Sequence, residues 1–203
     1  MAVTCAGLSI AARRACFAIE VLVSEANIFP MVVVTMDRAW RPHMTRSTYK
    51  SLSEEAALQI DQIMPWDLQK RLSAESGLLV LDVRERSEFE AAHIKGSLNV
   101  PRGILEAACD WDYAETEPEL VMARARPIVV VCRSGNRSAM AALVMKLMGY
   151  ANVASMKLGV KGWNDGDLPL VDCRNVAVDA DDAAHLIEPK LAAEQIDPAR
   201  RKA

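Results

Sequence analysis

PIVVVCRSGNRSAMAALVMKLMGY, Pro127–Tyr150, is the stretch that decides the fold. Its first five residues, Pro127–Val131, are all apolar, which is typical of a central parallel strand covered on both faces. A short polar loop beginning at Cys132 follows, and then an apolar segment whose one charged residue is Lys146. A helix this apolar is buried on most sides, and Gly149 stands where it would end. The order of strand, loop and buried helix indicates the core of an α/β domain.

Patterns on both sides of this stretch alternate between strand and helix. Short apolar runs predict further strands over residues 78–81, 97–100 and 153–156. Helices are predicted over residues 51–63, 65–72 and 87–93, and two of them begin with a Ser-x-x-Glu capping box, Ser51–Glu54 and Ser87–Glu90. The alternation, without any internal repeat, predicts one doubly wound α/β domain with a parallel sheet and helices on both faces.

The patterning divides the chain into three parts. Residues 51–170 carry the alternation and form the predicted domain. Residues 1–50 are expected to be an N-terminal extension, poorly ordered or the product of an over-long start, because Met31, Met36 and Met44 are alternative start sites. The apolar run in this extension is broken by charges and fits neither a membrane span nor a signal peptide. Residues 171–203 are expected to form an acidic C-terminal tail.

Composition and cysteine usage narrow the class of protein. With 51% hydrophobic and 25% charged residues, the composition is that of a soluble globular domain. A formal net charge of -3 predicts neither nucleic acid nor an anionic membrane surface as a partner. We expect no metal site, because the five cysteines include no Cys-x-x-Cys pair. Their odd, scattered set fits a reducing compartment, the cytoplasm: Cys5, Cys16, Cys109, Cys132 and Cys173.

The loop after the central strand concentrates groups that favour an anion. Cys132 lies at the carboxyl end of the strand, on the edge where open α/β sheets bind ligands. The following helix directs its free N–H groups and the positive end of its dipole toward the sulfur. Gly135 permits a tight curve, and the loop adds two fixed positive charges and three polar side chains: Arg133, Arg137, Ser134, Asn136 and Ser138. This pattern predicts a nucleophilic thiolate at Cys132.

Three blocks of the sequence, in order and at the expected spacing, resemble the signatures of single-domain rhodaneses. CRSGNRS, Cys132–Ser138, is similar to the active-site loop of that family. DVRERSEFEAAHIKGSLNVP, Asp82–Pro101, is similar to its first signature, and GVKGW, Gly159–Trp163, to the end of its domain. The resemblance covers about residues 60–170. Three departures lie outside the active loop, at positions where the family commonly has glycine: Ala92, Leu158 and Asp167.

The resemblance implies a rhodanese-like fold with a five-stranded sheet, and a thiosulfate sulfurtransferase that needs no metal or cofactor. Cys132 would be the catalytic residue, taking sulfane sulfur from thiosulfate or a persulfide donor and passing it to cyanide or a thiol. The loop would bind the substrate, its amides holding the persulfide and the leaving anion: Arg133, Ser134, Gly135, Asn136, Arg137 and Ser138. The implied partners are a small-molecule sulfur donor and acceptor, and a sulfur-relay protein.

Two other functions stay open at this point. Phosphatases and arsenate reductases also use a thiolate in a cradle of amides, but phosphatases place five residues between Cys and Arg, whereas four, Arg133–Asn136, intervene here. The tighter ring favours a single sulfur atom over a tetrahedral phosphate. A non-enzymatic sulfur carrier or interaction module is the third reading, and it would load Cys132 in the same way.

The charged residues of the two larger blocks have alternative roles. Arg137 is expected to bind the substrate anion, with a purely structural role in bracing the loop as the alternative. For Arg133, anion binding and simple exposure to solvent are equally favoured. We expect Asp82, Arg84 and Glu88 to form a structural charge network instead of acting in catalysis.

The remaining candidate residues are expected to be structural. His93 could act as a general base, but a buried histidine with satisfied hydrogen bonds is the favoured reading. Cys109 or Cys173 could serve as a second thiol that resolves the persulfide, which is the less favoured reading. Trp163 is expected to pack in the core.

Overall fold

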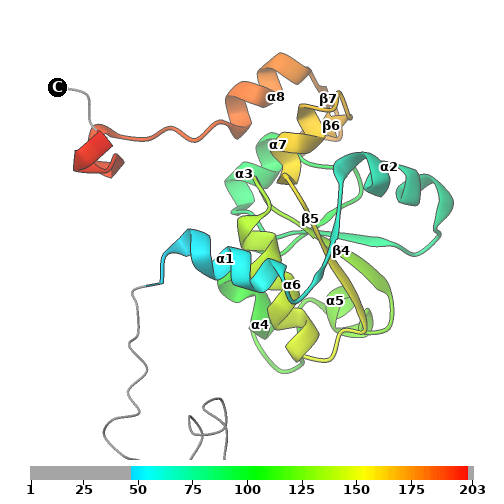
Figure 1. The fold of residues 1–203 in the computed structure, drawn as a ribbon. Helices are drawn as coiled ribbons and strands as arrows, with labels where there is room; N and C mark the ends of the chain where they lie inside the picture. The colour runs from blue at the N-terminus through cyan, green and yellow to red at the C-terminus, as the bar shows by residue number, and fades with distance from the viewer. Residues whose placement is uncertain (1–46, 201–203) are drawn as a thin grey trace, which may run out of the picture. The chain divides into compact units, whose positions relative to one another are not determined.

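The computed structural model describes residues 47–200, and the expectation for nearly all of the N-terminal extension lies outside them. Its centre is a sheet of five parallel strands in the order β1-β5-β4-β2-β3 (Figure 1). The strands are β1 Asp61–Ile63, β2 Leu79–Asp82, β3 Leu98–Asn99, β4 Pro127–Val131 and β5 Asn152–Met156. The predicted doubly wound α/β fold with a five-stranded parallel sheet is confirmed.

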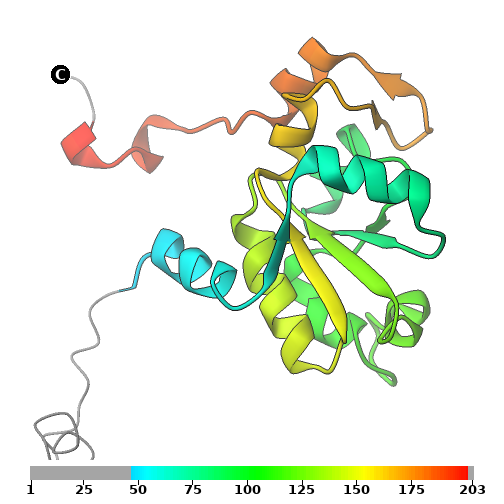
Figure 2. The ribbon, with the colours of Figure 1, turned by 45° about the vertical axis from the view of Figure 1, so that its right-hand side comes forward.

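Helices connect the strands and cover both faces of the sheet. Figures 1 and 2 show α1 beside α6 on one face and α2 near α7 on the other. The helices are α1 Tyr49–Ala57, α2 Pro65–Ala74, α3 Arg86–Ala91, α4 Leu105–Ala108, α5 Pro118–Met122, α6 Asn136–Leu147, α7 Gly159–Asn164 and α8 Ala180–Ile187. Short 3₁₀ turns occur at Arg102–Ile104, Ala193–Gln195 and Pro198–Arg200, and β6 Leu170–Val171 pairs antiparallel with β7 Ala177–Val178.

β4 occupies the middle of the sheet because its side chains are apolar and can be buried on both faces. Ile128 and Val130 pack in one hydrophobic cluster, whereas Val129 and Val131 pack in the other. This is the alternation of a strand, and Cys132 continues it on the side of Ile128. β4 is paired with β2 and with β5, so neither of its edges is free. The direction of the Cys132 side chain therefore follows from the strand that precedes it.

The two clusters tie different helices to the sheet. The first contains buried residues of α1, α4, α5 and α6: Ala56, Leu105, Leu120 and Met145 among them. The second contains buried residues of α2, α7 and α8: Leu68, Val160, Trp163, Ala183 and Ile187. Burying one large apolar side chain contributes about 1.5–3 kcal/mol, so each face adds substantially to stability. The sheet is thereby held as a rigid base for the loop after β4.

α1 and α3 begin earlier than their predicted capping boxes. At α1 the Ser51 N–H donates to the Thr48 side chain at 3.1 Å, and the Thr48 N–H donates to the Ser51 side chain at 2.9 Å. At α3 the N–H of Glu85 donates to the Glu88 carboxylate at 3.2 Å. Both predicted boxes are therefore wrong, because an earlier pair of residues with the same spacing satisfies the free N–H groups at each helix start.

The edge strand β1 falls inside a segment that was predicted as one helix over residues 51–63. α1 instead ends at Ala57, and Asp61–Ile63 pairs in parallel with residues 154–156 of β5. Two of the three β1 residues, Asp61 and Gln62, are exposed, so no apolar run marks the strand in the sequence. The helix prediction for residues 58–63 is wrong for this reason.

The chain after the sheet adds α8 to the second hydrophobic cluster. α8 packs against α7, and its Ala183 and Ile187 are buried there with Trp163. Trp163 is 1% exposed and its indole N–H donates to the Pro169 carbonyl at 3.0 Å. The predicted core role of Trp163 is confirmed, and α8 is brought close to the loop that α7 supports.

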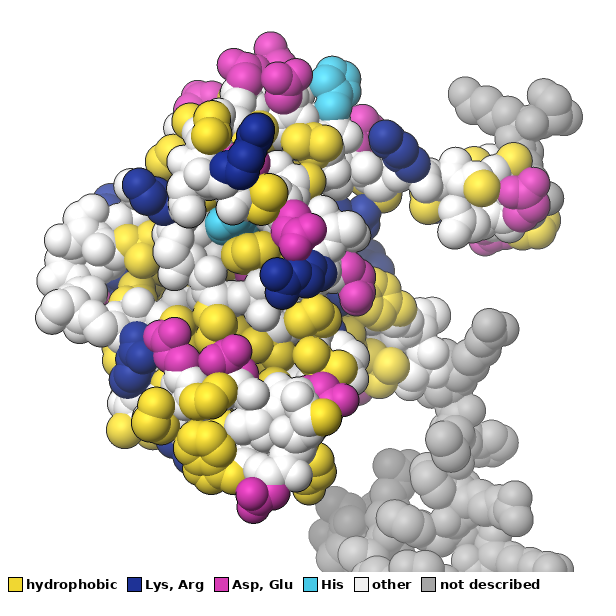
Figure 3. All heavy atoms as spheres, turned by 180° about the vertical axis from the view of Figure 1, so that it is seen from behind, with side chains coloured by type: hydrophobic (Ala, Val, Ile, Leu, Met, Phe, Trp, Pro, Cys, Tyr) yellow, Lys and Arg dark blue, Asp and Glu magenta, His cyan; other side chains and the backbone are white. Residues whose placement is uncertain are grey.

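The surface mixes charges of both signs. On the face shown in Figure 3, acidic and basic side chains are interspersed among hydrophobic ones. Within residues 47–200, no helix has the length and apolar character needed to cross a membrane.

Candidate active site

Cys132 directly follows β4 and begins the loop predicted to carry the chemistry. The residue is buried, with 1% of its surface exposed. The backbone N–H of Gly135 donates to the Cys132 Sγ at 3.2 Å. A backbone donor in this position stabilises negative charge on the sulfur. The loop thus curls back so that one of its own amides meets the thiol.

Two buried serines form a chain of hydrogen bonds that begins beside the thiol. The Cys132 Sγ lies 3.4 Å from the Ser138 Oγ. Ser138 donates to the Gly135 carbonyl at 3.0 Å and accepts from the Ser155 hydroxyl at 2.8 Å. Because a hydroxyl proton rotates, Ser138 can turn its proton to the sulfur when the sulfur is an anion. Ser155 was not identified by the sequence analysis. The residue reaches Ser138 because β5 pairs with β4 in this register, and no local sequence motif marks that pairing.

Gly135 turns the loop into α6. Its φ of +97° lies in the left-handed region that favours glycine, and it is the N-cap of the helix. A Cβ at this position would lie 3.3 Å from the Leu158 backbone nitrogen, so a side chain would also crowd the neighbouring turn. The free N–H groups of the first turn of α6 therefore begin at the loop, as predicted.

α7 holds the loop from the other side. The N–H of Val160 donates to the Cys132 carbonyl at 2.8 Å, and the N–H of Lys161 donates to the Arg133 carbonyl at 3.0 Å. Gly159 makes this approach possible, since a Cβ there would lie 2.4 Å from the Cys132 carbonyl oxygen. The GVKGW block therefore positions the loop through its backbone.

Two of the departures from the family pattern adopt the left-handed backbone conformation that favours glycine. Leu158 has a φ of +68° and Asp167 a φ of +55°. A non-glycine residue in this region costs roughly 1–2 kcal/mol. Gly162 leaves room for the Leu158 side chain, because a Cβ on Gly162 would lie 2.3 Å from the Leu158 Cβ. Leu158 is accommodated in this way next to the active loop.

Arg137 is paired with Glu88. Two guanidinium nitrogens of Arg137 donate to the two Glu88 carboxylate oxygens at 2.7 and 2.8 Å. Burial acts to raise the pKa of Glu88, but the hydrogen bonds and charge of Arg137 outweigh it and hold that pKa below its usual value. The same hydrogen bonds raise the pKa of Arg137, which also interacts with the charge of Cys132. Arg137 thus braces the loop against α3 and still adds positive potential at the sulfur.

Asp82 and Arg84 form a second, fully buried pair. The Arg84 side chain donates to Asp82 at 2.6 Å and to the Ala92 carbonyl at 2.8 Å. Asp82 lies opposite Val131 in the sheet, one residue before Cys132. The predicted structural role of this pair is confirmed, but Glu88 does not join its hydrogen bonds, because the bidentate bond to Arg137 uses its carboxylate.

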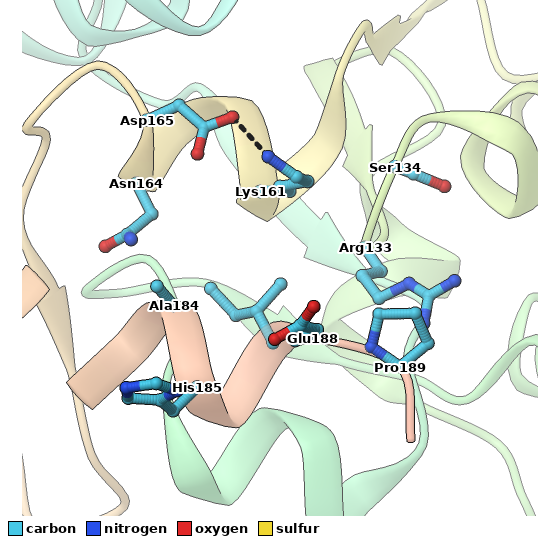
Figure 4. Close-up of a pocket in the computed structure, with 10 residues that line it drawn as sticks. Arg133, Ser134, Lys161, Asn164, Asp165, Ala184, His185, Glu188 and Pro189 are labelled. Atoms are coloured by element: carbon cyan, nitrogen blue, oxygen red, sulfur yellow. Dashed lines mark hydrogen bonds and ion pairs between the residues drawn. The ribbon is translucent and has the colours of Figure 1, made fainter. Parts of the chain in front are cut away.

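Arg133 and Ser134 point to a different side of the loop. Together with α7 and α8 they line a hollow of about 440 Å³ (Figure 4). A second hollow of about 400 Å³ lies toward α1 and is lined by Ser134, Gly135 and Asn136. The predicted binding residues are therefore not gathered around one pocket: the loop tip separates two.

Tyr49, the first residue of α1, is a site residue that the sequence analysis missed. Burial raises the pKa of the Tyr49 hydroxyl, as does the charge of Cys132, while Arg137 and Arg133 act to lower it. The Tyr49 hydroxyl therefore lies near the charged groups of the active loop, although its residue is 54% exposed. Had the capping box been assigned to Thr48 and Ser51, the predicted domain would have begun early enough to include Tyr49.

The other candidates are structural or separate from the thiol. The His93 ring is buried, stacks on Phe89 and hydrogen bonds through Nδ1 to the Phe89 carbonyl at 2.8 Å, which confirms its structural role. Cys109 is buried and burial raises its pKa, so it is a poor nucleophile, whereas Cys173 is exposed. The described part of the chain contains no cluster of three or more His, Cys, Asp or Glu side chains suited to a metal ion.

Known proteins are similar to this chain in sequence. The family model for the rhodanese-like domain matches residues 65–166. A Schizosaccharomyces pombe protein named "putative thiosulfate sulfurtransferase, mitochondrial" is 31% identical over 125 residues, which is 60% of this chain and 88% of that protein. A Bacillus subtilis protein named "putative sulfur carrier protein" is 32% identical over 111 residues. That match covers 55% of this chain and only 55% of the Bacillus protein.

A solved structure is also similar. It is a Rhodopseudomonas palustris protein of unknown function described as a "possible tyrosine phosphatase". The two chains superpose with a TM-score of 0.57 at 28% identity, over 64% of this chain and 98% of the other.

Proposed function

The chain belongs to the family of rhodanese-like domains, and from this premise we propose that it is a thiosulfate sulfurtransferase that carries sulfur on Cys132 as a persulfide. The observation that carries the proposal is the hydrogen bond from the Gly135 N–H to the Cys132 Sγ, inside a loop that continues into the free N–H groups of α6. A sulfur anion at this point meets preorganised donors before any substrate arrives.

The first half-reaction forms the persulfide. The Cys132 thiolate attacks the outer sulfur of thiosulfate, the S–S bond of thiosulfate breaks, and sulfite leaves with the bonding electron pair. The loop amides and the charge of Arg137 stabilise the persulfide that remains, and Arg133 adds positive charge for the arriving and leaving anions. Ser134, Asn136 and Ser138 supply further donors around the loop.

The second half-reaction removes the transferred sulfur from Cys132. An acceptor nucleophile, cyanide or a thiolate, attacks the outer sulfur of the persulfide, and the Cys132 thiolate leaves with its electron pair. The role of the protein in both steps is to hold the sulfur and to stabilise anions, so no cofactor is required. We place the protein in the cytoplasm with a small-molecule donor and acceptor, or a relay protein, as partners.

Phosphatase chemistry is the second candidate, favoured by the description of the Rhodopseudomonas relative. Against it stands the spacing of four residues, Arg133–Asn136, between the thiol and Arg137. Arg137 also points its two donors at Glu88, where a phosphatase would need them on the phosphate oxygens. A non-enzymatic sulfur carrier is the third candidate, favoured by the Bacillus relative, and it differs only in lacking rapid release to small acceptors.

The test is steady-state thiocyanate formation from thiosulfate and cyanide, compared with hydrolysis of an aryl phosphate by the same preparation. We expect thiocyanate formation that is lost in Cys132→Ser, and no phosphate release above background. Aryl phosphate hydrolysis that disappears in Cys132→Ser, without thiocyanate, would favour the phosphatase. Stable loading of Cys132 without turnover would favour the carrier.

A further inference from the structure

The hollow between the active loop and α8 has no role in the reaction as described so far. It measures about 440 Å³, within the range of small-ligand sites. Arg133 and Ser134 of the loop form one wall, and Ala184, Glu188 and Pro189 of α8 and the residues after it form another (Figure 4). This second wall lies beyond residues 65–166, the part that matches the family domain. One wall of the hollow is therefore built by residues outside the part of the chain that the family model matches.

The charges in the hollow are arranged for a ligand with both signs. Lys161 is neutralised by Asp165, at 2.6 Å. Arg133 and Glu188, by contrast, make no ion pair within residues 47–200, although both line the hollow. One cation and one anion thus face the same space, with the apolar surface of Ala184, Ile187 and Pro189 beside them. A ligand that carries a carboxylate and an ammonium group complements this arrangement.

We propose that this hollow binds the sulfur acceptor, and that the acceptor is a thiol of about dipeptide size with a carboxylate and an ammonium group. The carboxylate would lie at Arg133 and the ammonium at Glu188. The inference rests on the proposed function, since the acceptor must meet a persulfide on Cys132. Arg133 and Ser134 line the hollow and belong to the loop that begins at Cys132, so a ligand in the hollow lies against that loop.

The transfer then follows from the position of the acceptor. The acceptor thiolate attacks the outer sulfur of the protonated persulfide and forms a new S–S bond. The bond between that sulfur and the Cys132 Sγ breaks, and Cys132 leaves as the thiolate. α8 and the residues directly after it set the specificity of this step, because they provide Glu188 and the apolar wall, and they contribute nothing to the loading of thiosulfate.

The experiment separates the two half-reactions. Full-length protein is first loaded with thiosulfate, and sulfite release is measured. The persulfide is then discharged to four thiols of matched size: cysteinylglycine, its N-acetyl form, its amide, and the form with both changes. Cyanide serves as an acceptor that needs no hollow. Wild-type protein should discharge fastest to cysteinylglycine, which alone has both charges free.

Two variants, one in α8 and one directly after it, test the wall of the hollow. Glu188→Gln should lower kcat/KM for cysteinylglycine by roughly three- to fivefold, the value of one partly exposed ion pair, and leave the N-acetyl form unchanged. Ala184→Phe fills the hollow from an exposed position and should lower kcat/KM for all four thiols more than tenfold while sparing cyanide. Leu186→Phe and Asp182→Asn, on the same helix but outside the hollow, are the matched controls and should behave as wild type.

The possible outcomes distinguish failure of the acceptor site from failure of the proposed function. Equal rates for the four thiols in wild type, or equal losses in Ala184→Phe and Leu186→Phe, would overturn the acceptor site. Absence of loading in wild type would instead overturn the proposed function. In that case titration of Cys132→Ser with S-methyl-cysteinylglycine, followed by calorimetry, still tests the hollow: binding that Ala184→Phe abolishes supports it, and no binding overturns it.

Discussion

Two arginine–carboxylate pairs stand beside the active loop, and their surroundings differ. Arg84 and Asp82 lie 2.6 Å apart with side chains 2% and 0% exposed, whereas Arg137 and Glu88 lie 2.7 Å apart with side chains 25% and 32% exposed. A fully buried pair loses all its hydration, so it persists only with complete hydrogen bonding, which Ala92 and the backbone of Arg84 provide. The Arg137–Glu88 pair is only partly buried and still meets solvent. The first is therefore suited to shaping the sheet end, and the second to responding to an anion.

Breaking the buried pair should have the largest effect. Arg84→Met leaves the Asp82 carboxylate buried without its partner, and should lower the free energy of unfolding by about 3–5 kcal/mol. Chemical denaturation monitored by tryptophan fluorescence measures the loss. In the double variant Asp82→Leu/Arg84→Met no charge is left unpaired, so much of the stability should return. A double variant as unstable as Arg84→Met would show that shape, and not the charge, dominates.

Removing Arg137 should affect both stability and loading. Arg137→Gln removes a bidentate pair of intermediate burial, so we expect a loss of about 1–2 kcal/mol in the free energy of unfolding. It also removes a charge that acts on Cys132, and the KM for thiosulfate should rise about tenfold, or about 1.4 kcal/mol. Sulfite release at several thiosulfate concentrations is the measurement. An unchanged KM with the same loss of stability would make Arg137 a brace alone.

Glu88→Gln separates the two roles of the same pair. The substitution weakens the brace but leaves the charge of Arg137, so stability should fall by about 1 kcal/mol while the KM for thiosulfate stays the same or falls. The comparison with Arg137→Gln uses the same assay. If both variants raised KM equally, loop geometry and not charge would control loading.

The smallest effect is the pH dependence of stability. The pKa of Glu88 is held below its unfolded value of about 4.3, so the pair stabilises the fold above that pH and loses this contribution as the pH falls through the folded pKa. The stability of wild type should therefore fall more steeply than that of Glu88→Gln between about pH 5 and pH 3. Parallel curves from denaturation at each pH would contradict the assigned cause.

The centre of the fold was predictable because its signals are local. Residues 127–131 form β4 with the predicted bounds, since an all-apolar run before a polar loop has few other interpretations. β1 was not predictable in this way, because Asp61 and Gln62 lie exposed at the sheet edge. Helix starts at Thr48 and Glu85 were missed because several neighbouring side chains can cap, and only the three-dimensional path of the chain selects among them.

The site was predictable where its residues are consecutive and less so where they meet across the fold. Cys132, Gly135 and Ser138 lie together as expected, because the loop itself brings them together. The partner of Arg137 is Glu88, far away in the sequence, and the register of β5 brings Ser155 to the Ser138 hydroxyl beside the sulfur. Composition and motif spacing do not predict contacts between residues far apart in the sequence. The position of α8 beside the active loop was not predicted for the same reason.

The central claim is that Cys132 carries sulfane sulfur, and intact-protein mass spectrometry after incubation with thiosulfate tests it most directly. The account predicts a gain of one sulfur atom in wild type, located at Cys132 by peptide mapping, removed by cyanide and absent in Cys132→Ser. A wild-type protein that gains no sulfur, or a Cys132→Ser protein that gains the same amount, would contradict it.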